Sequence, residues 1–379
     1  MTTIMGAVRI LVAPQEFKGT LSAAEAAAAI TGGIRRVLPG AELDVCPIAD
    51  GGPGTVDALV DAARGERRVA RVHDPLGRPI DAVWGLIEGG ATAVIEMAAA
   101  SGLALLRPEE RDPRRTTTFG TGELIREALA AGCATIIVGV GGSATNDGGT
   151  GAAAALGVRF LDERGHPLPP GGVALTRLAR INLSARDRRL DDVDLLVATD
   201  VTNPLCGPEG ASVVYGPQKG GDPEAVSELE AALTRLAAVV KADLGIDLAL
   251  KPGAGAAGGL AYGLAVFCGG RIAPGFDLIA RALRLSRRIA AADVVVTGEG
   301  RLDSQTARGK GPGELARRAK QRGARTVAMA GAIDPGFDLA VSPFDEAIAA
   351  TPGGPPATAH EAADALARAA ESWARSLAV

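Results

Sequence analysis

Five glycine-rich loops hold most of the polar side chains with which this chain could do chemistry. They lie at residues 14–23, 49–55, 139–151, 198–210 and 297–311. Each is richer in glycine and polar residues than a simple turn requires. Open α/β sheets bind ligands beyond the carboxyl ends of their strands, where backbone N–H groups and helix N-termini converge. We therefore predict a ligand site assembled from strand ends.

The lysines indicate that the ligand carries phosphate. Only six of the 40 basic residues are lysines, and four of these six directly precede Gly or Pro in a glycine-rich stretch. A compact ammonium on a flexible stem suits a phosphate oxygen that it meets as a point charge. The four are Lys18, Lys219, Lys251 and Lys310. We expect at least one of them to act in the site, with Lys18 and Lys219 as the first candidates.

The loop at 139–151 permits two interpretations. Residues 139–144 fit the pattern G-x-G-x-x-[GA], and Asp162 follows at about the spacing of a ribose-binding carboxylate, which would indicate dinucleotide binding. However, glycine and polar residues continue through 146–151, where a Rossmann helix should already have begun. Hydroxyl, amide and carboxylate groups together suit phosphate with a metal or a hydroxyl-bearing substrate better. These side chains belong to Ser143, Thr145, Asn146 and Asp147.

Acidic residues at predicted strand ends bear on the reaction class. Phosphoryl transfer needs Mg²⁺ on one or two oxygen ligands, cations near the moving group, and often a carboxylate that accepts the proton of the attacking hydroxyl. Asp200 stands out, because it and the amide of Asn203 come right after a buried apolar strand. A single acid at such a position is about as often a turn or N-cap residue. The strand-end acids are Asp50, Asp200, Glu299 and Asp303.

Composition argues against several other classes. The chain has 379 residues with 44 acidic and 40 basic side chains, a net charge of -4, so no basic surplus exists to bind nucleic acid. The hydrophobic fraction of 47% supports a buried core. Four cysteines without a CxxC pair and three scattered histidines favour a reduced, cytoplasmic chain without a zinc site. No apolar run of about 18 residues occurs, so we predict no membrane span.

Short β-branched runs alternate with Ala/Leu/Arg-rich segments, which predicts a mainly parallel α/β protein. The length favours two domains. A capping box, Ser22 with Glu25, marks the start of one helix. The predicted strands are 8–13, 43–48, 83–87, 93–97, 135–140, 194–199, 294–297 and 326–330. The predicted helices are 22–37, 55–63, 122–131, 223–242, 312–322 and 360–376.

Taken in order, these loops resemble the motifs of the glycerate kinase type-1 family, bacterial enzymes that phosphorylate D-glycerate with ATP. The resemblance runs nearly from end to end. Two motifs depart from the usual family pattern: Gln15 and Glu16 replace the Asp and Ser of PDSFKG, and Pro53 replaces the acid of DGGEGT or DGGDGT. The matching segments are 13–23, 49–55, 139–148, 199–207, 215–220, 252–259 and 297–306.

The resemblance implies a two-lobed α/β fold. A flavodoxin-like (Rossmann-like) parallel-sheet domain would comprise residues 1–75 and 285–379, with a second α/β domain, residues 76–284, inserted. It also implies ATP and Mg²⁺ as cofactors, D-glycerate as the small-molecule substrate, and a phosphoglycerate product, with phosphorylation at the 2-hydroxyl favoured over the 3-hydroxyl.

With this chemistry in view, we assign expected roles to individual residues. The expected catalytic residues are Asp200, Lys18 and Asp303. The expected substrate-binding residues are Arg301, Asp50, Asn203 and Glu299. The expected nucleotide-binding residues are Gly141, Gly142, Ser143, Thr145, Asn146 and Lys219. The expected metal ligands are Asp147 and Asp200.

Two other functions stay open at this point. A nicotinamide-dependent dehydrogenase would use the loop that begins at Gly139, and a non-catalytic sugar-acid-binding protein would be favoured by the departures at Gln15 and Pro53. Assembly into a homo-oligomer through the Ala-rich helices also stays open.

Overall fold

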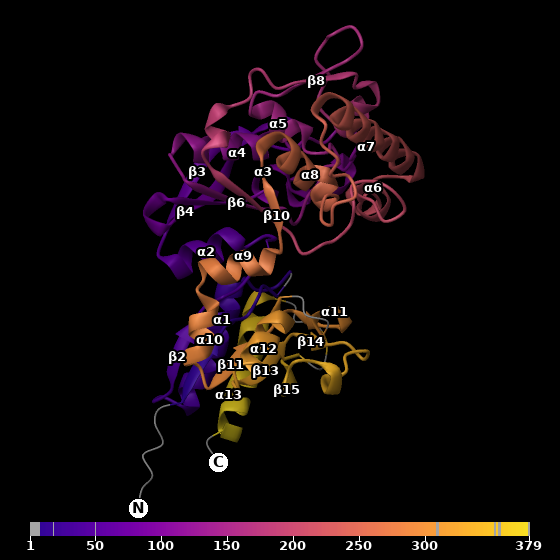
Figure 1. Cartoon of the computed structure of the whole chain (residues 1–379). Coiled ribbons are helices and arrows are strands. Elements are labelled where there is room, and N and C mark those ends of the chain that lie inside the picture. Colours follow the sequence, from indigo (N-terminus) through magenta and orange to yellow (C-terminus); the bar gives the residue numbers. More distant parts are fainter. Residues whose placement is uncertain are drawn as a thin grey trace, which may run out of the picture. The chain divides into compact units, whose positions relative to one another are not determined.

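The chain divides into two compact units in a computed structural model (Figure 1). Unit 1 comprises Met1–Asp50 and Phe276–Val379, and unit 2 comprises Gly51–Gly275. The residues described are 8–17, 19–49, 51–307, 311–351, 354 and 358–377.

The observed division differs from the expected one at both boundaries. Strand β3 (Glu66–His73) pairs along its whole length with β4 (Pro79–Ile87), which binds residues 66–73 into the sheet of unit 2. At the other boundary, Asp277 forms an ion pair with Arg318 of unit 1. Backbone pairing and packing thus place 51–75 in unit 2 and 276–284 in unit 1.

Unit 1 is built on a five-stranded sheet whose strands all run parallel, in the order β15-β13-β11-β1-β2. Numbered within the unit, this order is 2-1-3-4-5, which is the flavodoxin arrangement. The predicted fold class is therefore confirmed for this unit. The strands are β1 (Arg9–Val12), β2 (Glu42–Val45), β11 (Val294–Thr297), β13 (Arg325–Ala330) and β15 (Glu346–Ala349).

Two long helices of unit 1, α1 (Ala23–Val37) and α13 (Ala359–Leu377), lie side by side (Figure 1). They approach so closely at Gly33 that a Cβ there would lie 2.2 Å from the carbonyl oxygen of Ala367. The predicted capping box is present: the Ser22 N–H donates to Glu25 Oε2 (2.8 Å), and the Glu25 N–H donates to Ser22 Oγ (3.2 Å). The remaining elements are α9 (Gly275–Ala282), α10 (Leu285–Ala291), β12 (Arg301–Leu302), α11 (Ser304–Ala307), α12 (Pro312–Lys320), β14 (Ala332–Ile333) and the short 3-10 helix η7 (Leu339–Val341).

Unit 2 contains a mixed six-stranded sheet in the order β10-β9-β6-β5-β4-β3. Strands β5 (Thr92–Glu96), β6 (Thr135–Gly139), β9 (Asp194–Ala198) and β10 (Arg271–Ala273) are parallel, whereas β3 and β4 run antiparallel at one edge. The parallel part therefore places the carboxyl ends of β5, β6, β9 and β10 on one side of this sheet.

Helices and short turns complete unit 2 around one hydrophobic core. The sequence prediction missed strands β3 and β10 of the unit 2 sheet, strand β15 of the unit 1 sheet and, among the helices of seven residues or more, α8, α9 and α10; it also started α4 three residues late. The helices are α2 (Thr55–Ala63), α3 (Ala98–Ser101), α4 (Phe119–Ala130), α5 (Thr150–Ala155), α6 (Ala211–Tyr215), α7 (Pro223–Leu244) and α8 (Ala256–Cys268). The small strands are β7 (Arg159–Leu161) and β8 (Arg180–Asn182). The 3-10 helices are η1 (Glu88–Gly90), η2 (Leu103–Leu105), η3 (Pro108–Glu110), η4 (Gly172–Arg177), η5 (Arg188–Asp191) and η6 (Pro217–Lys219).

The cysteines and helix lengths bear on two further expectations. Cys46, Cys133, Cys206 and Cys268 are all unpaired thiols. Among the helices in the described part of the chain, none combines the length and the apolar character that crossing a membrane would need.

Candidate functional site

Three of the glycine-rich loops meet at the carboxyl edge of the unit 2 sheet. The Gly141 N–H, just after β6, donates to the carbonyl oxygen of Gly51 (3.2 Å), in the loop before α2. The neighbouring Val140 N–H donates to the carbonyl oxygen of Ala198 (3.3 Å), the last residue of β9. The prediction that strand-end loops from distant parts of the sequence come together therefore holds within unit 2.

Glycines are required where the loop after β6 meets the loop before α2, because the two backbones are in direct contact. A Cβ at Gly139 would lie 2.4 Å from the Gly51 carbonyl oxygen, and one at Gly141 would lie 2.6 Å from the Cα of Gly52. Contacts below 3.0 Å are not tolerated without a shift, and the obstructing atoms are backbone. These two glycines therefore let the loops after β6 and before α2 pack directly on each other.

Only part of the 139–151 loop reaches the surface. Gly142 is exposed and has a left-handed backbone (φ +74°), while Gly141 and Ser143 are half-buried. The carbonyl of Gly142 accepts the Leu103 N–H (2.9 Å), but the N–H groups of Gly142 and Ser143 have no acceptor within the described residues. We call this partly exposed segment, Gly141–Ser143, the phosphate turn after the role that the sequence predicts for it. It presents backbone donors of the kind that hold anions.

The other three predicted nucleotide-binding residues lie inside the protein. Thr145 and Asn146 are fully buried, and Lys219 is 1% exposed. Lys219 Nζ donates to the Thr145 carbonyl oxygen (2.7 Å), and Asn146 Nδ2 donates to Ser212 Oγ (2.9 Å). Burial lowers the pKa of Lys219 to about 7, although the negative charge of Asp147 acts in the opposite direction. All three side chains are enclosed by protein, the Thr145 hydroxyl and Asn146 Oδ1 have no hydrogen-bond partner among the described residues, and the expected nucleotide contacts of the three residues stay a prediction.

Asp147 is a buried capping residue. Its Oδ2 accepts the Thr118 N–H (2.8 Å) and the Gly151 N–H (3.2 Å), and its Oδ1 accepts the Gly149 N–H (3.0 Å). It thus joins the N-terminal ends of α4 and α5. Burial raises its pKa, against the lowering effect of these hydrogen bonds. The carboxylate is enclosed and accepts hydrogen bonds from protein donors, and its expected role as a metal ligand stays a prediction.

Sequence reasoning missed the threonines that surround this carboxylate. Thr117 and Thr118 hydroxyls donate to Asp147 Oδ2 at 3.3 and 2.9 Å, and the Thr116 hydroxyl donates to the Ala144 carbonyl (2.8 Å). Three threonines directly before helix α4 were the available signal, because such residues typically lie at helix N-termini.

Asp200 is half-buried and lies two residues beyond the end of β9. Its Oδ1 accepts the N–H of Gly275, just after β10, at 2.8 Å. Because β9 and β6 are neighbours in the sheet, Asp200 and the phosphate turn follow adjacent parallel strands. Asn203, by contrast, is held within its own loop: its Nδ2 donates to the Glu209 carbonyl (2.8 Å), and its Oδ1 accepts the Tyr215 hydroxyl (2.7 Å).

The described unit 1 candidates, Glu299, Arg301 and Asp303, follow β11. The Thr306 hydroxyl donates to Glu299 Oε1 (2.6 Å), and the Thr306 N–H donates to Asp303 Oδ1 (3.2 Å), so one threonine links both carboxylates. Arg301 is exposed and pairs with Asp334 (2.7 Å). Lys18, Asp50 and Lys310 lie outside the described residues.

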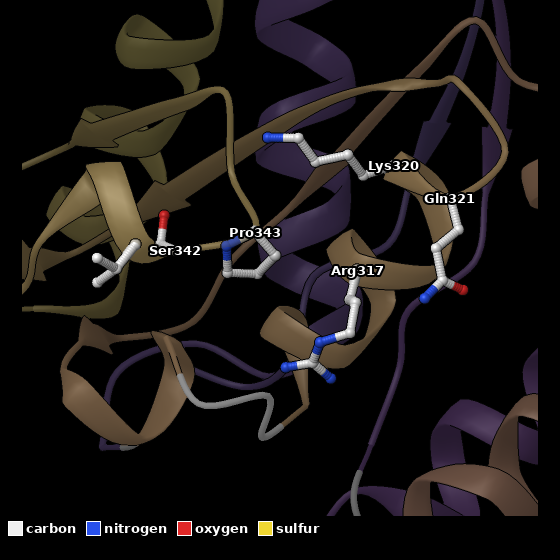
Figure 2. A pocket seen from close by; sticks show the side chains of 6 residues that line it. Arg317, Lys320, Gln321, Ser342 and Pro343 are labelled. Atoms are coloured by element: carbon white, nitrogen blue, oxygen red, sulfur yellow. The ribbon is translucent and has the colours of Figure 1, made fainter.

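Two hollows in unit 1 lie apart from these loops. One, of about 380 Å³, lies between the end of α12 and the segment around Ser342 (Figure 2). Lys320 at its margin is paired with Asp345 at 2.9 Å. The other, of about 300 Å³, lies along the amino-terminal parts of β1 and β2 and contains the Arg288–Asp44 ion pair. No described residue of the expected site lines either hollow.

Comparisons with known proteins decide the family. A family model described as the glycerate kinase family matches residues 10–378. The chain belongs to the glycerate kinase family. Glycerate kinase of Halalkalibacterium halodurans is 48% identical over 329 residues, which cover 87% of each chain. Glycerate 2-kinase of Escherichia coli K12 is 46% identical over 326 residues, which cover 86% of each chain. The crystal structure of a Salmonella typhimurium LT2 protein assigned as glycerate kinase 2 matches with a TM-score of 0.88 and 43% identity, over 98% of this chain and 99% of that one.

The two departures from the glycerate kinase motifs have distinct surroundings. Gln15 is buried, and a Cβ on Gly311 would lie 2.2 Å from its Oε1. Its N–H donates to the Gly298 carbonyl (2.8 Å), so the loops after β1 and β11 adjoin at the point where the strand order of unit 1 reverses. Pro53 is exposed, and its Cγ would lie 3.3 Å from a Cβ on Gly142. Gln15 therefore fills the packed junction between the loops after β1 and β11, and Pro53 borders the phosphate turn.

The dinucleotide interpretation of the 139–151 loop fails on geometry. Helix α5 begins at Thr150, whereas a Rossmann helix would begin at the third small residue of the fingerprint, Ala144. The five residues between Ala144 and Thr150 are buried, and this segment is hydrogen-bonded to Lys219, Ser212 and the N-terminus of helix α4. The 139–151 loop therefore consists of a surface turn followed by a buried segment.

Proposed function

We propose that this protein phosphorylates D-glycerate with ATP and forms 2-phosphoglycerate. The observation that carries the proposal is the position of Asp200 and the phosphate turn at the ends of adjacent parallel strands, in a chain of the glycerate kinase family. The names of its relatives, glycerate kinase and glycerate 2-kinase, support the choice of substrate and of hydroxyl.

In this proposal the phosphate turn binds the nucleotide. The N–H groups of Gly142 and Ser143, which have no acceptor within the described residues, donate to phosphate oxygens, and Gly142 provides the left-handed backbone of the turn. The Ser143 hydroxyl adds a further donor. Thr145, Asn146 and Lys219 support the turn from inside.

Asp200 accepts the proton of the attacking hydroxyl in the proposed reaction. Its half-buried position leaves it accessible to a small substrate, and the Gly275 N–H fixes one carboxylate oxygen. A positioned acceptor of this kind typically contributes about 10²–10⁴-fold to the rate.

Mg²⁺ fits the site with one of the two expected ligands. No group of three metal-binding side chains occurs within the described ranges, and Asp147 is enclosed by protein donors. Mg²⁺ usually takes one or two carboxylates together with phosphate oxygens, and Asp200 is a half-buried carboxylate near the phosphate turn. When bound there, Mg²⁺ would neutralise charge that develops on the transferred phosphoryl group.

For unit 1, we propose that Lys18 and Arg301 bind negative charge, on the carboxylate of glycerate or on the transferred group. Glu299 and Asp303, joined by Thr306, would orient the substrate hydroxyls or serve as a reserve base. Asp50 and Asn203 remain proposed substrate contacts. The unpaired cysteines support a cytoplasmic location.

A coupled assay tests the function directly. Purified protein with ATP and Mg²⁺ should release ADP only when D-glycerate is added, and phosphorus NMR of the product should show the 2-phosphate. L-glycerate and NAD serve as controls for stereochemistry and for the dehydrogenase alternative. ADP release that does not depend on D-glycerate would refute the assignment of the substrate, and a 3-phosphate product would refute the assignment of the hydroxyl.

A further inference from the structure

We propose that Lys219 is a positioning residue, which holds the phosphate turn in its binding conformation by anchoring the Thr145 carbonyl from inside the core of unit 2. The inference rests on the proposed nucleotide-binding role of that turn. It gives Lys219 a function other than the direct phosphate contact expected from its glycine-rich surroundings.

The first support is the burial of this lysine. Lys219 is among the largest fully buried side chains of the chain, at 1% exposure. Lysines are almost never fully buried unless they are paired, because removing an ammonium from water is costly. Its Nζ donates to the Thr145 carbonyl oxygen at 2.7 Å. Because burying this ammonium is costly, we expect its hydrogen bond to hold the Thr145 carbonyl in a position that the protein requires.

The second support is the environment of the Thr145 carbonyl. A Cβ on Gly258 would lie 2.0 Å from this oxygen, so the Gly258 backbone packs directly against it. Three consecutive residues, Ala257, Gly258 and Gly259, have left-handed backbones (φ +55°, +65° and +86°). Left-handed geometry is unfavourable for alanine, which makes this turn a strained feature. The strained turn and the Lys219 ammonium therefore both hold the same peptide carbonyl.

The third support is that residues on either side of Thr145 are also anchored. The Ala144 N–H donates to the Ser101 carbonyl (3.0 Å), and the Asn146 amide donates to Ser212 (2.9 Å). The Gly148 N–H donates to the Gly258 carbonyl (2.9 Å). Segment 144–148 is thus held by several hydrogen bonds directly after the phosphate turn, and Lys219 donates one of these bonds.

The charges around Lys219 agree with an internal role. Asp147 is the negative group that favours the ammonium, while burial opposes it. The backbone carbonyl of Arg111 packs against Gly220, which follows Lys219 and has a left-handed backbone (φ +92°).

The test compares Lys219→Met with Lys219→Gln and with the matched control Lys241→Met. Lys241 lies on α7 of the same unit, is exposed, and pairs with Asp247. If Lys219 acts through the turn, the KM for ATP should rise about tenfold in Lys219→Met while the KM for D-glycerate stays constant, and Lys219→Gln should lie between this variant and wild type. The control should match wild type. If Lys219→Met does not fold, Lys219→Gln carries the comparison.

Ionic strength separates positioning from direct contact. A lysine that meets phosphate in contact with solvent loses part of its effect as salt screens the charge, whereas a hydrogen bond inside the core does not. The ratio of variant to wild-type KM for ATP should therefore be the same at low and high salt. A ratio that collapses toward one in high salt would overturn the proposal in favour of direct contact. Unchanged KM values with a lower melting temperature would reduce Lys219 to a purely structural role.

Hydrogen exchange gives a readout that does not depend on activity. Amides of residues 140–147 should exchange faster in Lys219→Met than in wild type, while those of 194–198 in strand β9 should not change. If the wild-type protein proves inactive on D-glycerate, the proposed function fails, and exchange together with ATP binding still decides the role of Lys219. Equal exchange of residues 140–147 in Lys219→Met and wild type would contradict the positioning role of Lys219.

Discussion

The Asp200 carboxylate accepts a hydrogen bond from the backbone N–H of Gly275, at 2.8 Å. Gly275 is the last residue of unit 2, where the chain passes into unit 1. At the other chain crossing, Gly51 is the first residue of unit 2, and its carbonyl accepts the N–H of Gly141. At both places where the chain passes between the units, the backbone is therefore hydrogen-bonded to a residue that we place in the site, Asp200 or Gly141.

Replacing Asp200 by Asn should lower kcat by about 10²–10⁴-fold, because the amide cannot accept the hydroxyl proton. Steady-state kinetics with D-glycerate and ATP measure the effect. Asp192→Asn, an exposed change just before the same strand, is the matched control. Wild-type turnover in a folded Asp200→Asn protein would remove Asp200 from this role.

Gly275→Pro removes the N–H that holds Asp200, and proline is tolerated in the first turn of a helix, where α9 begins. Because hydrogen bonds to charged groups contribute about 1.5–3 kcal/mol, we expect kcat to fall by about tenfold or more. Gly275→Ala keeps the N–H and serves as the control. Equal activity of the two variants would show that this hydrogen bond does not position Asp200.

Gly142→Ala should weaken ATP binding more than it weakens the fold. The left-handed backbone (φ +74°) costs an alanine about 1–2 kcal/mol, and its Cβ would lie 3.3 Å from Ala98 Cβ and Pro53 Cγ. Gly245→Ala is the matched control, since Gly245 has nearly the same φ (+68°) but open space around its Cβ. We expect similar losses in melting temperature for both variants, and a raised KM for ATP only in Gly142→Ala. A raised KM in both would mean that general strain, not the turn, is responsible.

The sequence predicts the strand-end loops well but cannot separate two uses of glycine. A glycine that binds phosphate and one that permits backbone contact look the same in the sequence, and Gly139 proves to be of the second kind, with Gly51 against it. The polar residues pose the same problem. Ser143 reaches the surface, whereas Asn146 and Asp147 turn inward, in part because Ser212 and the α4 terminus, which bind them, are distant in sequence.

The missed strand β3 has a different cause. Its residues Glu66, Arg67 and Arg68 are charged and exposed, because β3 is an edge strand that packs through only a few side chains such as Val72. Charged residues protect a sheet edge against aggregation, and they also hide the alternating pattern that identifies a strand.

Stability should rise with pH above neutrality because of Lys219. Burial lowers its folded-state pKa to about 7 from the usual 10.5 of a lysine, so between these values the unfolded chain binds more protons than the folded one. The free energy of unfolding therefore gains from rising pH in this window, by at most about 5 kcal/mol. Buried thiols oppose the trend, since burial raises the pKa of Cys46 and Cys206 to about 11 and holds their thiolates unfavourable in the folded state. The difference between wild type and Lys219→Gln in urea unfolding, measured at several pH values from 7 to 9, isolates the lysine. Parallel pH profiles for the two proteins would show that the ammonium stays charged in the folded state.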